Sequence, residues 1–422
     1  MIRKSQNMIK YIIKRILIMI PMLIMVLIFT WLLSHMMSVN PVSNKIGFNL
    51  DPDVYERELR RIGYYDPWYV QLGIYLQNFF TGEWGKSYIV LPEKPVLEII
   101  ASIFPKTIEL MIFPIVIVPI IAVKLGVLSA KNKNKSKDIL IRLIAILGAG
   151  FPVFWIATLL QRFVGISLSR FTYGAIAIEV VYSNSPDLDG PPIDNFPPFM
   201  NNLFSFLFFL LLILGIILLY KNFNNFRDSK RNKNLIYTIL GSLIIIISLV
   251  PIILLVIAFF ENSYGTGFRI IDSLLYNDQI YLWDTLIHLF LPVISITFVS
   301  LAGITRLTRS SMLEVMDQDY IRTARAKGVL EKDVINKHAL RNALLPTSNL
   351  IIGGTASALL GSLFVEVTFN YRGFGFYMVQ SIFAGDFLVI NGLLVFSVII
   401  ILTGTLVADV MYTVIDPRII YR

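Results

Sequence analysis

Cysteine is absent from this chain of 422 residues, which excludes disulfide bridges, thiolate metal sites and cysteine nucleophiles. Charged side chains are scarce: they make up 15% of the residues, whereas hydrophobic ones make up 56%. An ordinary soluble domain has about 25% charged residues. Together with a mean hydropathy of +0.70, this composition predicts an all-α protein whose main solvent is lipid.

The signatures of a metal site or an enzyme are also missing. The three histidines, His35, His288 and His338, lie far apart in the sequence, so we expect no metal site and no cofactor. The chain has no GxSxG or HExxH pattern and no paired aspartates in a hydrophobic run, which argues against a membrane-embedded hydrolase. We therefore expect no catalytic residues.

One stretch imitates a nucleotide-binding loop. Gly85, Lys86 and Ser87 look like the end of a phosphate-binding loop, but Phe80 stands where such a loop needs another glycine. The stretch is also expected to face outward, away from ATP. We predict that the chain has no nucleotide site.

Eight hydrophobic runs are long enough for membrane spans, because a helix needs about 20 apolar residues to cross the hydrocarbon core. They cover residues 12–34, 104–124, 139–161, 202–220, 235–260, 285–306, 346–368 and 388–414. The first run follows a basic start, but it is too long for a signal peptide and lacks a small-residue cleavage site. The expected fold is therefore a polytopic helical bundle of about eight transmembrane helices.

The basic residues predict the orientation of this bundle. If the N-terminus is inside, most of the 37 Lys and Arg residues fall in inner segments, as the positive-inside rule requires. An even number of spans then places both termini in the cytoplasm. Topology thus accounts for the net charge of +9, and we expect contact with membrane lipid and none with nucleic acid.

The longest inner connection, residues 308–345, carries the most informative pattern. Ser310 and Ser311, followed by an acidic residue, predict a helix cap and then an amphipathic helix that runs to Gly328. Because glycine accepts a positive φ, Gly328 is expected in the turn from which this helix projects. A second polar helix over 332–343 would lead into the next span.

The sequences DYIRTARAKG and HALRNALLP in this loop resemble the coupling segment of ATP-binding-cassette importer permeases. The general pattern there is E-A-A, three residues, G, nine residues, I, any residue, L-P. Ala324 and Gly328 match it, whereas His338 stands where the isoleucine is expected. The departures are similar to the variant in the B-type subunit of the oligopeptide and dipeptide permease family. GEWGKS at 82–87, FPVFW at 151–155, FVEVTFNYRGFGFYMVQSI and the terminal VIDPR resemble the same family.

The resemblance implies a six-helix importer core with an inserted pair of helices. Residues 166–284 depart from the family, because two extra hydrophobic runs and long outer loops stand where a short connection is usual. The expected divisions are 1–35 (tail and first transmembrane helix), 36–103 (extracellular amphipathic region), 104–165 (transmembrane helices two and three), 166–284 (insertion) and 285–422 (permease core with coupling loop 308–345).

The resemblance also implies function and partners. It implies a multi-pass subunit of the inner (cytoplasmic) membrane that forms half of a pore for oligopeptides or dipeptides and does not itself hydrolyse ATP. The implied partners are a second homologous permease, two ATP-binding-cassette ATPase subunits on the cytosolic side and an extracellular substrate-binding protein. The expected surface for ATPase docking is Arg322, Thr323, Ala324, Arg325, Ala326, Lys327 and Gly328.

Charged residues within spans are candidates for the substrate pathway, because charge is costly to bury in a bilayer. Three carboxylates qualify: Glu109 near the outer end of the second span, Glu366 near the outer end of the seventh, and Asp409 toward the inner end of the eighth. Glu109 lies three positions after Lys106, so the two could instead pair on one helix face.

Two other function classes remain open on the sequence. A secondary transporter driven by protons or sodium would show broken helices or midplane carboxylates in two matching halves, and no internal repeat is visible. A membrane scaffold without transport activity is the other alternative. Copurification of an ATPase subunit separates the importer from both. The transported solute stays open, because relatives of the family also carry metal chelates, glutathione or sugars.

Overall fold

The computed structural model describes residues 2–36, 56–57, 60, 64–171 and 267–415. Every named element within those ranges is a helix, which confirms the expected all-α class. The elements are α1 (Ile2–Met36), α4 (Trp68–Thr81), α5 (Val96–Lys131), α6 (Ser136–Gly150), α7 (Val153–Leu160), the π-helix η1 (Gln161–Gly165), α8 (Ile166–Phe171), α11 (Arg269–Leu275), α12 (Gln279–Met316), α13 (Asp319–Ala326), α14 (Glu331–Asp333), the π-helix η3 (Val334–Ala339), α15 (Leu340–Gly361), α16 (Leu363–Thr368), α17 (Phe374–Ala384) and α18 (Phe387–Ile415).

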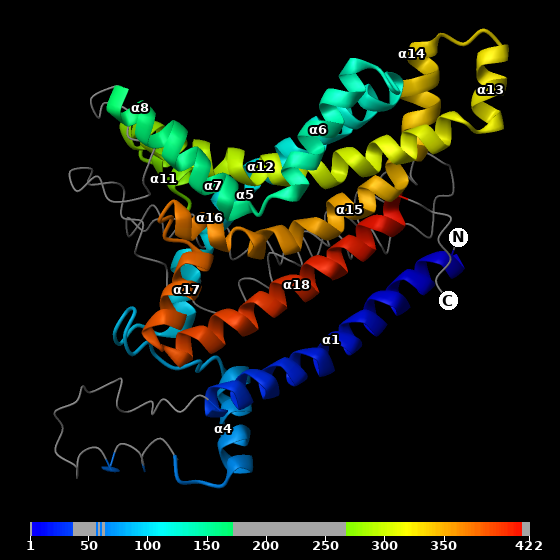
Figure 1. Cartoon of the computed structure of the whole chain (residues 1–422). Coiled ribbons are helices and arrows are strands. Elements are labelled where there is room, and N and C mark those ends of the chain that lie inside the picture. The colour runs from blue at the N-terminus through cyan, green and yellow to red at the C-terminus, as the bar shows by residue number, and fades with distance from the viewer. Residues whose placement is uncertain (1, 37–55, 58–59, 61–63, 172–266, 416–422) are drawn as a thin grey trace.

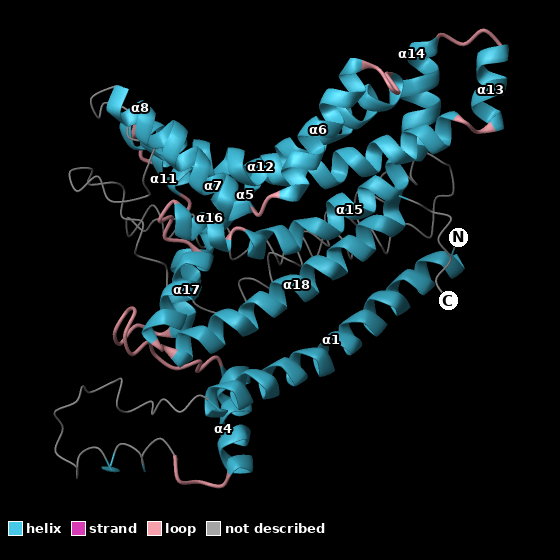
Figure 2. Cartoon of the chain, in the orientation of Figure 1, coloured by secondary structure: helices cyan, strands magenta, loops and turns pink. Residues whose placement is uncertain are grey.

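The long helices lie side by side and give the described chain two ends (Figure 1). α12 packs along α5 and α6, α15 packs against α12 and α18, and α1 packs against α18. At one end, which we define as the hairpin end, lie α13 and α14, the start of α1 and the last turns of α18. At the opposite end lie α4, α17 and the loop over 82–95, and Figure 2 shows the loops that connect the described helices.

Three helices are long and apolar enough to cross a membrane, among the residues that the structure describes. They are α5, α12 and the stretch Phe387–Leu406 of α18, and the bent pair α6 and α7–η1 makes a fourth if it counts as one span. A shorter apolar stretch, Leu17–Leu33, lies in α1. The expected runs at 202–220 and 235–260 lie outside the described residues. The chain is thus a multi-pass membrane protein, and the number eight stays a prediction.

The run at 139–161 is not the single continuous helix that the sequence suggested. α6 ends at Gly150 and α7 begins at Val153, and the two halves are bent by 104°. Phe151 is extended, with φ −112° and ψ 137°, because a residue that precedes proline is kept out of the helical region. Pro152 also cannot donate a backbone hydrogen bond to continue the helix.

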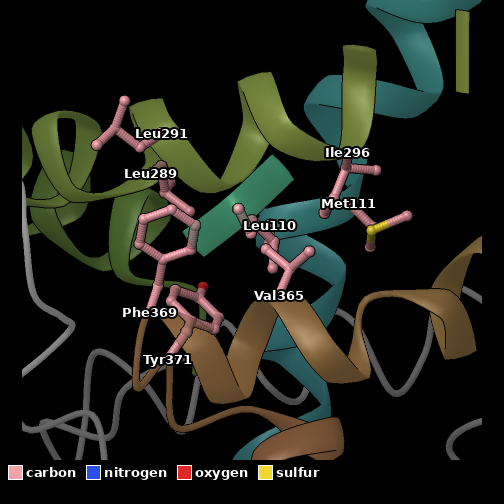
Figure 3. Close-up of a cluster of buried hydrophobic side chains, with 9 residues drawn as sticks. Leu110, Met111, Leu289, Leu291, Ile296, Val365, Phe369 and Tyr371 are labelled. Atoms are coloured by element: carbon pink, nitrogen blue, oxygen red, sulfur yellow. The ribbon is translucent and has the colours of Figure 1, made fainter. Parts of the chain in front are cut away.

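A buried apolar cluster packs several helices against one another (Figure 3). It combines residues of α5, α7, α12 and the α16–α17 segment: Leu110, Met111, Ala157, Leu289, Leu291, Ile296, Val365, Phe369 and Tyr371. The Tyr371 hydroxyl donates a 2.7 Å hydrogen bond to the carbonyl of Lys106, so its polar tip is satisfied. Because lipid tails are as apolar as leucine, close packing and such bonds hold the helices together in a membrane, and water exclusion contributes little.

Candidate functional site

The connection between α12 and α15 forms a compact helical hairpin, residues 317–339, at the hairpin end of the molecule (Figure 1). α13 makes the outgoing arm, and α14 with η3 makes the returning arm, which runs directly into α15. The expected second polar helix over 332–343 is therefore confirmed as helix, with the difference that its middle part, Val334–Ala339, is a π-helix. The hairpin is continuous with two long helices.

The predicted cap at the start of this region is wrong. α12 continues through Ser310 and Ser311 and ends at Met316. Ser311 is buried within the helix, and its neighbour Met312 is fully buried in the core of the hairpin. Packing of this apolar side chain outweighs the local capping preference of serine, so the chain breaks only at Asp317 and Gln318.

Gly328 ends α13 as predicted. Its φ is +78°, in the left-handed region that costs a residue with a side chain about 1–2 kcal/mol. The amide of Gly328 donates to the carbonyl of Arg325 at 2.9 Å, and the amide of Val329 donates to the carbonyl of Ala324 at 3.2 Å. These two bonds form a Schellman motif, in which the turn satisfies carbonyls that the helix end leaves unpaired.

The hairpin buries one face of α13 and leaves the other open. Ile321 is fully buried against a core that joins the ends of α5, α12 and α15: Ala130, Met312, Ile321, Val334, Ile335, Ala339 and Ala343. Ala324 is half-buried against this core. The other six residues expected to dock an ATPase are exposed: Arg322, Thr323, Arg325, Ala326, Lys327 and Gly328. The structure thus brings the predicted set together on one exposed corner.

An ion pair across the turn fixes the two arms. The guanidinium of Arg325 donates to both carboxylate oxygens of Glu331, at 3.1 Å and 2.9 Å. This hydrogen bonding lowers the pKa of Glu331 and raises the pKa of Arg325. Arg325 therefore already has a partner within the hairpin, whereas Lys327 is exposed beyond it. The pairing of Glu331 could not be predicted from the sequence, because its partner Arg325 lies across a turn and not at a helical spacing.

The candidate Glu109 lies on α5 and is nearly fully buried. Its carboxylate accepts a 2.6 Å hydrogen bond from the backbone amide of Ile270, at the start of α11. Arg269, the first residue of α11, lies with its guanidinium over the ring of Tyr281 from α12. Glu109 thus anchors α11 between α5 and α12, and a contact with substrate stays a prediction.

The candidate Glu366 is fully buried and accepts four hydrogen bonds. One oxygen accepts from the hydroxyls of Thr107 and Ser362, at 2.9 Å and 2.8 Å. The other accepts from the amides of Gly375 and Phe376, at 2.7 Å and 3.1 Å. These amides belong to the first turn of α17, so this side chain from α16 caps the helix that follows. Its role in the substrate pathway stays a prediction.

The candidate Asp409 lies on α18 at the hairpin end and pairs with Arg15 of α1 across 3.0 Å. The two side chains are 24% and 41% exposed. The pair joins the first and last described helices, consistent with the packing of α1 on α18. Asp409 thus differs from the buried carboxylates Glu109 and Glu366, because it is partly exposed and paired with an arginine.

Sequence reasoning missed Asp386, which occupies the loop that imitates a phosphate site. One oxygen of this buried carboxylate accepts from the hydroxyl of Ser87 at 2.6 Å, and from the backbone amides of residues 88, 89 and 90 at 3.0, 3.0 and 3.2 Å. Successive amides of this kind form an anion-binding nest. Here Asp386 supplies the anion, so its hydrogen bonds attach the 82–95 loop to the start of α18.

Long apolar helices, buried carboxylates held by hydrogen bonds and a polar hairpin between the long helices α12 and α15 define a multi-pass membrane protein of the permease type. Residues 229–421 match the family described as the binding-protein-dependent transport system inner membrane component. The chain belongs to the oligopeptide and dipeptide family of ATP-binding-cassette importer permeases, which confirms the resemblance found in the sequence.

Its relatives match it over nearly their whole length. The chain is 30% identical to the dipeptide transport system permease protein of Alkalihalophilus pseudofirmus, over 98% of this chain and 100% of the relative. It is 28% identical to the oligopeptide transport system permease protein of Bacillus subtilis, over 97% and 99%. It is 27% identical to the dipeptide transport system permease protein of Lactococcus lactis, over 98% and 99%. The protein is thus a transmembrane permease of an importer.

Proposed function

We propose that this permease imports oligopeptides or dipeptides across the cytoplasmic membrane as one half of a pore, beside a second homologous permease. Two ATP-binding-cassette ATPases assemble on the cytosolic side, where the 317–339 hairpin of this chain couples to them, and an extracellular binding protein delivers the peptide. The observation that carries the proposal is the exposed face of α13, where the residues that match the family's coupling segment lie together next to the turn at Gly328.

The packing of the hairpin supports its role as a lever. Its core contains Met312 of α12, Ala130 of α5 and Ala343 of α15, so a force on α13 acts at once on three long helices. The ion pair between Arg325 and Glu331 adds a contact between the two arms across the turn. In this mechanism, closure of the ATPases around ATP shifts the hairpin and turns an inward-open pore into an outward-open one.

The size of the peptide is the finer part of the proposal. The relatives include permeases named for dipeptide transport and one named for oligopeptide transport. Because the binding protein selects the solute in this class of importer, both substrate classes fit this chain. We favour oligopeptides as the first substrate to test and dipeptides as the second.

Copurification from detergent tests the assembly. A tagged permease, expressed with its neighbouring genes, is expected to bring down a second permease and ATPase subunits, and the reconstituted complex should accumulate peptides from an isotope-labelled protein digest when ATP is present. A matched variant that lacks the hairpin residues 319–331 should insert in the membrane but lose the ATPases. Retention of the ATPases by that variant, or no ATPase with the wild type, would contradict the proposal.

A further inference from the structure

A buried ion pair lies next to the hairpin and includes none of the residues predicted to dock an ATPase. Asp138, in the first turn of α6, is fully buried. Arg309 of α12 donates to both of its carboxylate oxygens, Nε to Oδ1 at 2.8 Å and Nη2 to Oδ2 at 2.9 Å. Two-pronged pairs of this kind fix the relative orientation of the groups as well as their distance.

The same carboxylate also holds the turn between α5 and α6. The hydroxyl of Ser129, a buried residue in the last turn of α5, donates to Oδ1. The backbone amide of Asn134, in the turn itself, donates to Oδ2 at 2.9 Å. Arg142, one turn later on α6, lies 3.6 Å from Oδ2 and is 44% exposed. One side chain thus connects α5, the α5–α6 turn, α6 and α12.

Glycines bring these helices into close contact on both sides of the ion pair. A Cβ at Gly126 of α5 would lie 2.5 Å from the Cβ of Thr308, next to Arg309 on α12. A Cβ at Gly148 of α6 would lie 2.9 Å from the carbonyl oxygen of Phe298, also on α12. The helices therefore approach one another closely at both positions, with the ion pair between them.

The unit is also in direct contact with the hairpin. Ala130, the residue after Ser129, is buried in the hairpin core with Met312 and Ile321. Arg309 lies one turn before Met312 on the same helix. A displacement of α13 can therefore reach α6 through the point where Asp138 joins α6 to α12, and α6 leads on to the 104° bend with α7.

We propose that Asp138 and Arg309 are positioning residues for transport: the ion pair transmits the movement of the hairpin to the bent α6–α7 segment. The proposal rests on the proposed function, in which the hairpin is moved by ATPases. Without the pair, α12 and α15 still move with the hairpin, but α6 and α7 no longer move fully with α12. Hydrolysis then continues while less peptide is transported for each ATP.

The test uses the complete complex in proteoliposomes, with both permeases, the ATPases and the binding protein. Peptides from a ¹³C-labelled digest are quantified by mass spectrometry, and ATP hydrolysis is measured in the same vesicles. Asp138→Asn keeps the shape of the side chain and removes its charge. We expect peptide transported per ATP to fall by about fivefold or more, in the range of ordinary coupling energies, with ATPase copurification and hydrolysis unchanged.

Two further variants separate coupling from folding. Arg142→Gln removes the exposed neighbour of the same carboxylate and should leave the ratio unchanged. The double variant Asp138→Asn with Arg309→Gln should be no worse than the poorer single variant, because the two residues act through one interaction. Where Asp138→Asn does not assemble, Ser129→Ala, which deletes one donor and keeps the ion pair, is measured in its place and should show a smaller fall in the same ratio.

The outcomes decide between three readings. An unchanged ratio in an assembled Asp138→Asn complex overturns the inference, as does a parallel loss of assembly and hydrolysis in Ser129→Ala, which would make the pair a folding element only. A wild-type complex that binds no ATPase or transports no peptide overturns the proposed function instead. A lowered ratio in an intact complex supports the inference.

Discussion

At the scale of single residues, Gly328 links a backbone angle to the proposed coupling function. Its φ of +78° is needed for the Schellman turn, yet nothing lies within 4 Å of the position that a Cβ would take. A substitution there strains the backbone without any steric clash in the folded hairpin. The position thus isolates the effect of backbone conformation from the effect of packing.

Gly328→Val should lower peptide transport per ATP, because a β-branched residue is strongly disfavoured at positive φ and would move the exposed corner of α13. Gly328→Asn is the matched control, since asparagine visits the left-handed region readily and should retain most of the activity. The strain is about 1–2 kcal/mol, enough to shift the turn but not to unfold the bundle. Normal coupling in the valine variant would exclude a need for this turn geometry.

Single residues also show which features can be predicted from the sequence and which cannot. The turn at Gly328 could be predicted because its hydrogen bonds join residues within the short stretch 324–329. Asp386 and Asp138 were not, because their partners lie far along the chain: Ser87 is 299 positions from Asp386, and Arg309 is 171 positions from Asp138. Pairings of this length depend on how helices pack, and local pattern gives no information on that.

At the scale of elements, α17 depends on a cap that it does not contain. Gly373 stands at its N-cap position without a side chain that could accept a hydrogen bond. Glu366 of α16 supplies the acceptor instead, and a Cβ at Gly373 would lie within 2.7 Å of this carboxylate. The absence of a side chain at Gly373 therefore leaves room for the Glu366 carboxylate that caps α17.

Glu366→Ala should destabilise the permease, because it leaves two amides and two hydroxyls without their acceptor, at a cost of about 1–3 kcal/mol for each buried group. Glu366→Gln keeps one carbonyl oxygen and should lie between. The measurement is the thermal unfolding temperature in detergent, followed by peptide uptake at a temperature where both variants are folded. An unchanged unfolding temperature with altered peptide preference would instead favour the substrate-pathway role.

The break between α6 and α7 could have been predicted from local sequence, unlike the cap of α17 by a distant residue. The local signal was present in the sequence, since Pro152 pushes Phe151 out of the helical region. The hydrophobic run continued across it, however, and the length of that run suggested one straight span. Hydropathy indicates whether a segment lies in lipid, whereas proline and the residue before it decide whether the helix continues. The two signals therefore answer different questions.

At the scale of the whole molecule, the arrangement of the ends carries the functional argument. The hairpin, the start of α1 and the last turns of α18 lie at one end, and the 82–95 loop lies at the other (Figure 1). Among the described residues, basic residues that predicted an inner side, such as Arg15, Arg322 and Lys332, lie on elements of the hairpin end. Charge pattern and fold thus agree on which segments share a side, although neither names the compartment.

The absence of cysteine makes that compartment measurable without a background signal. Lys332→Cys places a thiol on an exposed position of the hairpin, and Lys94→Cys places one on an exposed position of the 82–95 loop. A membrane-impermeant maleimide added to intact cells should label the loop variant at once and the hairpin variant only after permeabilisation. This result is expected because the positive-inside rule puts the basic hairpin in the cytosol.

A third variant controls for burial. Leu393→Cys lies on α18 with a fully buried side chain, so it should react only after denaturation, which shows that labelling reports exposure and not mere expression. If the hairpin thiol reacts in intact cells while the loop thiol does not, the bundle has the reverse orientation. The hairpin would then face away from any source of ATP, and no cytosolic ATPase could act on α13.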